Sequence, residues 1–361
     1  RHDPGNNRTI SANLITSIFE DSRGDLWVGT ENGLDRFDEK NNRFIHYRHN
    51  KNDKNSISDN FVRAIFEDKQ HKLWIGTLKG GLNLYNRNDN KFTSFLHNEQ
   101  DKSSLSHNNI YTLFEDSKNQ LWIGTNGGGL DLFDPTSATF THYQHDENNS
   151  NSLSGNDVFA INEDSEHNLW VGTENRGLNI FNPGKGIFNR YVNDDVDNTS
   201  LSNNSIYAIF RDTKNNMWVG TFSGGVNLVD PDAQKFSHFK HMASKNSLSH
   251  NNVLSIIEDS EKKIWIGTDG GGLNLFDPVT ETFTHFRHSN NNKNSICADY
   301  VLSLCEDSKG NIWIGTWGGG VTVFNKKQNS YRHYKNDPHD STSLSSNNAW
   351  KIFKDKDDNI W

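Results

Sequence analysis

Short apolar runs alternate with polar stretches rich in Asn, Asp, Ser and Gly along the whole chain. Residues 104–143 contain four such runs, at 110–114, 121–125, 130–133 and 140–143. Their β-branched and aromatic residues favour strands. The glycines at 127–129 and the Asp134-Pro135 pair provide turn residues between them. No run has the 3.6-residue periodicity of a helix, so the pattern predicts four short antiparallel strands.

The pattern repeats, because a Leu/Ile/Met-Trp dipeptide recurs every 47 or 48 residues. The tryptophans are Trp27, Trp74, Trp122, Trp170, Trp218, Trp265, Trp313 and Trp361. Four strands in every 40–50 residues are typical of a propeller blade. We therefore predict an all-β fold, a seven-bladed β-propeller of four-stranded antiparallel blades with a truncated eighth repeat at the C-terminus. The first seven tryptophans are interpreted as structural residues that pack between blades.

The repeats set the predicted domain boundaries. Residues 1–335 are assigned to the propeller, with blades at about 9–47, 56–95, 104–143, 152–191, 200–239, 247–286 and 295–334. Residues 336–361 form a partial eighth repeat. This last segment begins a further ring, pairs with the first blade as a closing strand, or belongs to an eight-bladed ring. Seven complete units favour a seven-bladed ring.

Two positions vary between repeats whose framework is otherwise nearly constant: the residue after the Thr of the second strand, and one residue of the first strand. Since loops on a rigid scaffold carry function, we expect ligand contacts there and in the adjoining loops. The candidate residues are Glu31, Arg63, Tyr111, Glu174, Arg176, Tyr207, Phe222, Asp269, Tyr300 and Trp317. Their aromatic rings can stack on a ligand and their charged groups can fix its polar atoms. Sequence drift at exposed sites is the alternative explanation.

Charge narrows the range of partners. The formal net charge is -9 and there is no basic block, which argues against nucleic acid and anionic membrane surfaces. No apolar run approaches the roughly 20 residues of a membrane span. Both ends of the chain, Arg1 and Trp361, are interpreted as cut ends of a longer protein. Cys297 and Cys305 are expected on one strand, too far apart for a disulfide, and hence to be free thiols.

Repeated polar residues are interpreted as structural. Histidines recur in the predicted fourth strand, at His46, His142, His238, His285 and His333. Because they lie on different blades they cannot converge on one metal ion, and we expect them to face solvent. We predict no metal site and no cofactor. Residues 355–359 weakly imitate a calcium-binding loop, so calcium is the one ion left open.

Paired acidic residues also recur, at Glu20-Asp21, Glu67-Asp68, Glu115-Asp116, Glu163-Asp164, Glu258-Asp259 and Glu306-Asp307. One active site needs one constellation rather than six copies. We interpret both members of each pair as turn residues. The sequence shows no nucleophile–base pair and therefore predicts binding rather than catalysis.

The repeat motif S-x-N-x-V-x-x-I-x-E-D-x-x-G-x-L-W-I-G-T-x-x-G-G-L-x-x-F-D resembles the two-component regulator propeller repeat. Repeat six carries the resemblance at Ser249, Asn251, Val253, Ile256, Glu258, Asp259, Ile264, Trp265, Ile266, Gly267, Thr268, Gly271, Gly272, Leu273, Phe276 and Asp277. The chain departs from the motif at residues 297–300, at Arg211, which replaces Glu, and at Asn162, which replaces an apolar residue.

The resemblance implies an extracytoplasmic sensor region, periplasmic or extracellular, of a membrane-anchored bacterial protein. Such proteins pass a signal to a histidine kinase with its response regulator, or to a diguanylate cyclase. The implied partners are a small molecule or an oligosaccharide, and a second copy through a homodimer of the parent protein. Two other functions stay open: a protein-interaction scaffold, and a propeller glycoside hydrolase or lyase.

Overall fold

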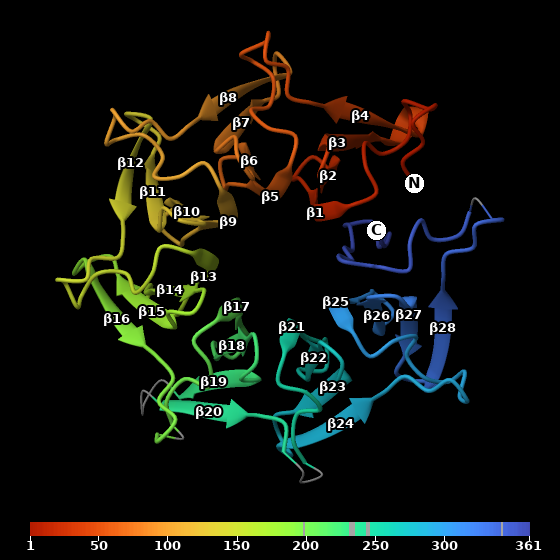
Figure 1. The fold of residues 1–361 in the computed structure, drawn as a ribbon. Coiled ribbons are helices and arrows are strands. Elements are labelled where there is room, and N and C mark those ends of the chain that lie inside the picture. The colour runs from red at the N-terminus through yellow and green to blue at the C-terminus, as the bar shows by residue number, and fades with distance from the viewer. Residues whose placement is uncertain (198, 231–234, 243–245, 341) are drawn as a thin grey trace. The chain divides into compact units, whose positions relative to one another are not determined.

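The structure is a computed structural model that describes residues 1–197, 199–230, 235–242, 246–340 and 342–361. It contains seven separate sheets, and each has four antiparallel strands in sequential order (Figure 1). Within the described residues the one helical element is the single 3-10 turn η1 (Glu39–Asn41), and none forms a helix that could span a bilayer. The prediction of a seven-bladed β-propeller with four-stranded blades is confirmed.

The chain divides into two compact units. Unit 1 comprises Arg1–Glu174 and Asn179–Arg190, and unit 2 comprises Asn175–Leu178 and Tyr191–Trp361. The strands of blades 1 to 4, in order, are β1 (Ile15–Glu20), β2 (Leu26–Thr30), β3 (Gly33–Asp38), β4 (Arg43–Tyr47), β5 (Val62–Glu67), β6 (Leu73–Thr77), β7 (Leu82–Asn86), β8 (Lys91–Phe95), β9 (Ile110–Glu115), β10 (Leu121–Thr125), β11 (Leu130–Asp134), β12 (Thr139–Tyr143), β13 (Val158–Glu163), β14 (Leu169–Thr173), β15 (Leu178–Asn182) and β16 (Ile187–Tyr191).

Blades 5 to 7 belong to unit 2. Their strands are β17 (Ile206–Arg211), β18 (Met217–Thr221), β19 (Val226–Asp230), β20 (Lys235–Phe239), β21 (Val253–Glu258), β22 (Ile264–Thr268), β23 (Gly272–Asp277), β24 (Thr282–Phe286), β25 (Val301–Glu306), β26 (Asn311–Thr316), β27 (Gly320–Asn325) and β28 (Ser330–Tyr334). The assignment of residues 336–361 to a further ring, a closing strand or an eighth blade stays a prediction.

The repeated tryptophans pack between blades, as predicted. Trp27 of β2 is fully buried, and its ring lies 5.1 Å from that of Tyr85 in β7 of the next blade, in an edge-to-face arrangement. Trp74 makes the same kind of contact with Phe133 of blade 3, at 5.2 Å. An aromatic ring removes a large apolar area from water, so these contacts hold neighbouring sheets face to face.

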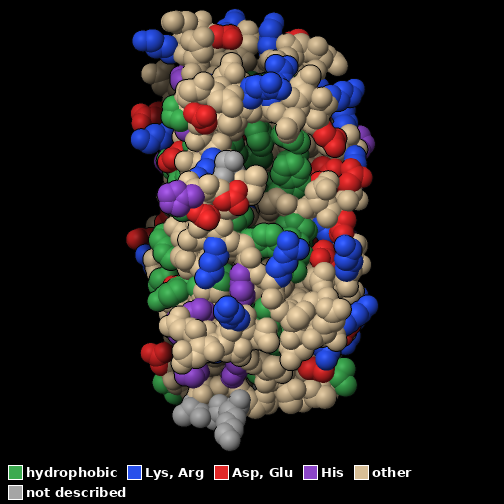
Figure 2. Space-filling model, turned by 90° about the vertical axis from the view of Figure 1, so that its right-hand side faces the viewer, with side chains coloured by type: hydrophobic (Ala, Val, Ile, Leu, Met, Phe, Trp, Pro, Cys, Tyr) green, Lys and Arg blue, Asp and Glu red, His purple; other side chains and the backbone are tan. Residues whose placement is uncertain are grey.

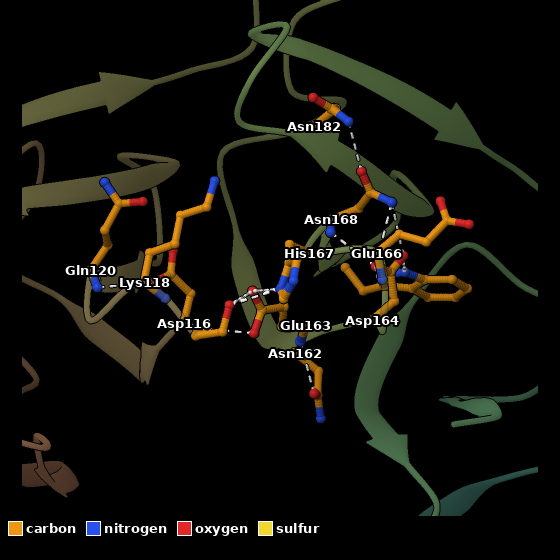
Figure 3. A network of polar contacts seen from close by, with 12 residues as sticks. Asp116, Lys118, Gln120, Asn162, Glu163, Asp164, Glu166, His167, Asn168 and Asn182 are labelled. Atoms are coloured by element: carbon orange, nitrogen blue, oxygen red, sulfur yellow. Dashed lines mark hydrogen bonds and ion pairs between the residues drawn. The ribbon is translucent and has the colours of Figure 1, made fainter. Parts of the chain in front are cut away.

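The Asp of each acidic pair begins the turn between the first and second strands. Asp164 Oδ1 accepts the backbone N–H groups of Glu166 and Asn168, each at 2.9 Å (Figure 3). Its Oδ2 accepts the indole N–H of Trp170 at 2.9 Å. The turn role is therefore confirmed. The bond to the tryptophan was not predicted, and it explains how a buried indole keeps its donor satisfied.

The prediction that the Glu of each pair is also a turn residue is wrong. Glu163 is the last residue of β13, and its carboxylate accepts the backbone N–H of Ser117 at 2.9 Å and the Ser117 hydroxyl at 2.7 Å (Figure 3). The glutamate is therefore part of the first strand, and its side chain contacts the turn of the preceding blade. The same contact joins Glu67 to Ser22, Glu115 to Lys69, Glu258 to Thr213 and Glu306 to Ser260.

Two basic side chains add ion pairs to these contacts between neighbouring blades. Arg87 of blade 2 binds Asp21 of blade 1 at 2.6 Å and its own Glu67 at 2.8 Å. Burial alone would raise the pKa of Asp21, but hydrogen bonds from Trp27 and Arg87 outweigh it and lower that pKa. Lys326 bridges Asp259 and Glu306 in unit 2 in the same way, at 2.9 Å to each.

The prediction that the fourth-strand histidines simply face solvent is wrong. His142 Nε2 lies 2.6 Å from the carbonyl oxygen of Ser104, in the loop that precedes its blade. A carbonyl only accepts, so the ring nitrogen donates. His46, His238, His285 and His333 bond the carbonyls of Asn7, Ser200, Ser247 and Lys293 in the same way. These histidines fasten the fourth strand to the inter-blade loop.

The two cysteines are free thiols, as predicted, but the predicted reason is wrong. Cys305 lies in β25, whereas Cys297 precedes that strand. The backbone N–H of Cys297 donates to Thr322 Oγ1 at 3.0 Å.

The outer surface mixes acidic and basic side chains without a block of one sign on the face drawn in Figure 2.

Candidate ligand-binding face

The loop after each second strand holds the first variable position. Thr125 Oγ1 donates to the carbonyl of Gly129 and accepts the N–H of Gly128, each at 3.0 Å. Gly129 has φ 88°, and a Cβ there would lie 2.5 Å from the Tyr143 carbonyl oxygen, so only glycine fits. The N–H of Asn126 then bonds the carbonyl of Asn109, just before β9, at 2.9 Å. This bond places the variable side chain beside the start of the first strand.

The same backbone bond forms in the other blades. It joins Glu31 to Leu14, Leu78 to Phe61, Glu174 to Asp157, Phe222 to Ser205, Asp269 to Asn252 and Trp317 to Tyr300. Every blade thus presents its two variable positions at the same end of its strands. We call the residues after the Thr, together with the first two residues of each first strand, the residue before it and the equivalent positions of the partial eighth repeat, the rim.

In unit 1 the rim carries a row of stacked side chains. The Arg63 guanidinium carbon lies 4.6 Å from the centre of the Tyr111 ring and 5.9 Å from that of Phe61. Tyr111 stacks on Phe159 with ring centres 4.1 Å apart and an interplanar angle of 21°. These residues come from β5, β9 and β13, which are neighbouring first strands. The repeat therefore converts one sequence position into a continuous surface.

In unit 2 the rim carries exposed aromatic residues. The ring centres of Tyr207 and Phe222 lie 5.7 Å apart. Trp317 and Trp350 meet edge to face, with ring centres 5.1 Å apart and an interplanar angle of 87°. Tyr300 pairs with Asp269 through an isolated backbone bridge. The exposed fractions are 40% for Tyr207, 50% for Phe222, 49% for Tyr300, 48% for Trp317 and 43% for Trp350.

The remaining candidates are more scattered. Glu31 and Arg176 are exposed. Glu174 is half-buried beside Asp157. The structure thus brings together Arg63 with Tyr111, Tyr207 with Phe222, and Asp269 with Tyr300, as the preceding contacts show.

Sequence reasoning missed two members of the rim. Trp350 lies 48 residues after Leu302, so it is the eighth copy of the variable first-strand position. Phe159 is a copy of the same position, but its stacking on Tyr111 becomes visible only when neighbouring strands are placed. Asp299, which departs from the motif, is a structural residue: its carboxylate accepts the N–H of His288 at 2.7 Å, as Asn60 accepts that of His49.

Polar side chains also lie beside the rim. Burial, with a further contribution from His97, lowers the pKa of His107, which lies next to Gly127. Among the described residues no group of three His, Cys, Asp or Glu side chains could hold a metal ion. In the calcium-like stretch, Asp355 Oδ2 accepts the Trp361 indole N–H at 2.8 Å. This repeats the Asp–Trp bond of the blades.

The fold is a seven-bladed β-propeller, and known structures share it. One is the extracellular domain of BT3049 from B. thetaiotaomicron, which is assigned as a hybrid two-component system and is 24% identical in sequence to this chain. The two structures match with a TM-score of 0.65, and the match covers 98% of this chain and 50% of the BT3049 domain. PorZ, a surface component of the type-IX secretion system of Porphyromonas gingivalis, is 17% identical with a TM-score of 0.60 over 86% and 46%.

The Dos1 propeller has 12% identity and a TM-score of 0.62 over 97% of this chain and 90% of its own. No curated protein matches the sequence. This chain spans about half the length of the BT3049 domain.

The repeat itself identifies the family. The model of the two-component regulator propeller matches one segment in each blade: residues 9–32, 56–79, 104–127, 152–175, 200–223, 247–270 and 295–318. The chain belongs to the two-component regulator propeller family.

Proposed function

We propose that this chain is the ligand-binding input region of a membrane-anchored two-component signalling protein. It binds an extracytoplasmic ligand, a small molecule or a glycan fragment, on the rim, and relays binding to a kinase or cyclase output. The segment itself performs no catalysis, and it faces the periplasm or the exterior. A homodimer of the parent protein provides the route for the signal.

One observation carries the proposal. Ten large hydrophobic side chains of the described residues are exposed, and five of them are aromatic. All five, Tyr207, Phe222, Tyr300, Trp317 and Trp350, belong to the rim. Exposed rings of this kind cost solvation free energy unless they meet a partner, and rings stack on the apolar faces of sugars and other cyclic ligands. The family and the extracellular domain of BT3049 support the signalling role.

The test is a thermal-shift screen of the chain against neutral and acidic oligosaccharides and small cyclic metabolites, followed by calorimetry on each hit. We expect a hit whose affinity falls about fivefold in Trp317→Ala, because stacking on an aromatic ring stabilises a complex by about 1 kcal/mol. Val279→Ala, which changes an exposed apolar residue outside the rim, is the control and leaves the affinity unchanged.

Two results would contradict the proposal. If no compound shifts the unfolding temperature while a protein partner binds tightly, the chain is an interaction scaffold. If compounds bind but Trp317→Ala and Val279→Ala behave alike, the rim is not the binding face.

A further inference from the structure

The guanidinium of Arg63 lacks a counterion in an acidic chain. Its net charge is -9, and the half-buried Arg36 and Arg87 pair with Asp25 and Asp21. Within the part of the chain that the structure describes, Arg63 has no ion pair and no side-chain hydrogen bond. Arginine carries five N–H donors and remains charged at all physiological pH values, so this group is available to an anion.

The guanidinium is also held in place. Arg63 is half-buried, with the ring of Tyr111 4.6 Å from its guanidinium carbon. Phe159 stacks on Tyr111 at 4.1 Å and fixes that ring in turn. A cation over an aromatic face is stabilised by the quadrupole of the ring. The stack therefore restrains the position of the guanidinium, and a ligand has less side-chain entropy to overcome.

The location limits what can bind. Val62 beside Arg63 is buried, and its carbonyl accepts the Thr16 hydroxyl of blade 1 at 2.5 Å. Glu31, in blade 1, is exposed on the rim. Rim residues that carry rings continue along β9 and β13. A ligand over this row meets one fixed positive charge and then the side chains of the two stacked aromatic residues.

We propose that Arg63, Tyr111 and Phe159 form an anion subsite of the rim that selects a cyclic ligand with a carboxylate or sulfate substituent. The guanidinium takes the anionic group through two parallel N–H donors, since a planar fork matches a carboxylate or sulfate. The ligand ring lies toward Tyr111 and Phe159. This inference rests on the proposed function and names the ligand charge that unit 1 recognises.

The experiment is calorimetry on the whole chain with trigalacturonate, a sulfated galactan oligosaccharide and neutral galactotriose. We expect the two anionic compounds to bind at least tenfold more tightly than the neutral one. Arg63→Gln is expected to lose that preference, because a charge-assisted hydrogen bond is stronger than a neutral one. Arg63→Lys keeps the charge but not the fork, and is expected to recover part of it.

Arg23→Gln is the matched control. It removes the same charge from an exposed turn at the other end of the strands of blade 1, and is expected to leave binding unchanged. Tyr111→Leu provides a second route if Arg63→Gln alters the fold, which its unfolding midpoint reports. It should weaken binding of the anionic ligands while keeping Arg63.

The outcomes separate this inference from the proposed function. Equal binding of neutral and anionic compounds, or an unchanged preference in Arg63→Gln, overturns the anion subsite and leaves a neutral ligand for the rim. Equal loss in Arg63→Gln and Arg23→Gln shows general charge attraction and also overturns it. No binding by any of the three compounds overturns the anion subsite, and if the wider screen is also empty, the proposed function fails with it.

Discussion

Blades 1 and 3 contain the same buried pair of residues in two different electrostatic states. Asp35 of β3 faces His46 of β4, and Asp131 of β11 faces His142 of β12 in the same register. Both carboxylates are fully buried. Each accepts a backbone N–H from the preceding loop, at 2.7 Å in blade 1 and 2.9 Å in blade 3.

The histidine makes the difference. His46 Nδ1 lies 2.6 Å from Asp35 Oδ1, while its Nε2 donates to the Asn7 carbonyl at 2.8 Å. Both ring nitrogens of His46 are therefore engaged, and blade 1 holds a buried His–Asp ion pair. In blade 3 the Oδ1 of Asp131 has no hydrogen-bond partner among the described residues, and burial raises the pKa of Asp131 to about 6.

The sister blades explain the strain on Asp131. At this position Asn83 donates its amide to the Ile75 carbonyl of the second strand at 3.4 Å, and Asn179 donates to Val171 at 3.3 Å. Asp131 stands opposite Ile123 in the same register. A carboxylate oxygen there replaces a donor, so the protonated acid fits the site better than the anion. The comparison teaches that a buried Asp beside a His is an ion pair only when the ring nitrogen reaches it.

Breaking the pair in blade 1 gives the largest effect. His46→Leu leaves the Asp35 carboxylate buried without a counterion, and we expect it to lower the free energy of unfolding by about 3 kcal/mol or more. The control is His285→Leu in blade 6, where the facing residue is Asn274. That change removes one neutral hydrogen bond and costs about 1 kcal/mol. Urea unfolding at pH 7 measures both, and equal losses would refute the ion pair.

Replacing the acid by its amide should act in opposite directions in the two blades. Asp131→Asn restores the donor of the sister blades and is expected to raise the free energy of unfolding by about 1–3 kcal/mol at pH 7. Asp35→Asn removes the anion that pairs with His46 and is expected to lower it. Urea unfolding of the two variants side by side gives the result. Destabilisation by both changes would mean that Asp131 is as well satisfied as Asp35.

The pH dependence of Asp131→Asn sharpens this test. Because folding raises the pKa of Asp131 from 3.8 to about 6, the anion destabilises the native protein increasingly between these values. The difference between Asp131→Asn and the parent chain should vanish below pH 3.8 and be complete above about pH 6. We expect it to grow by about 1 kcal/mol from pH 5 to pH 7. A gap independent of pH would show that titration of Asp131 is not the cause.

An exposed acid provides the smallest effect. Glu31→Gln removes one negative charge from the rim of blade 1, where water solvates the side chain. We expect less than about 0.5 kcal/mol change in the free energy of unfolding. Thermal unfolding in parallel with Asp131→Asn checks this, and a larger effect would mean that net charge, rather than burial, sets the differences between the acids.

The sequence was sufficient for the fold because the strand pattern, the turn glycines and the period of the tryptophans all lie within one repeat. The period also located the rim, since Thr125 and Gly129 fix the same loop geometry in each copy. It did not reveal the partners of Glu163 or His142, because those contacts join residues of different loops and blades. Nor could it show that Tyr111 and Phe159 stack, which depends on the packing of neighbouring strands.

The contact from Glu163 to Ser117 joins unlike ends of successive repeats. The donor belongs to the turn of one copy and the acceptor to the first strand of the next, so a copy that ends its first strand in Glu carries one half of each kind, whereas blade 5 has Arg211 at that position. A gene duplication that adds one such copy beside another therefore recreates the same junction without any compensating substitution.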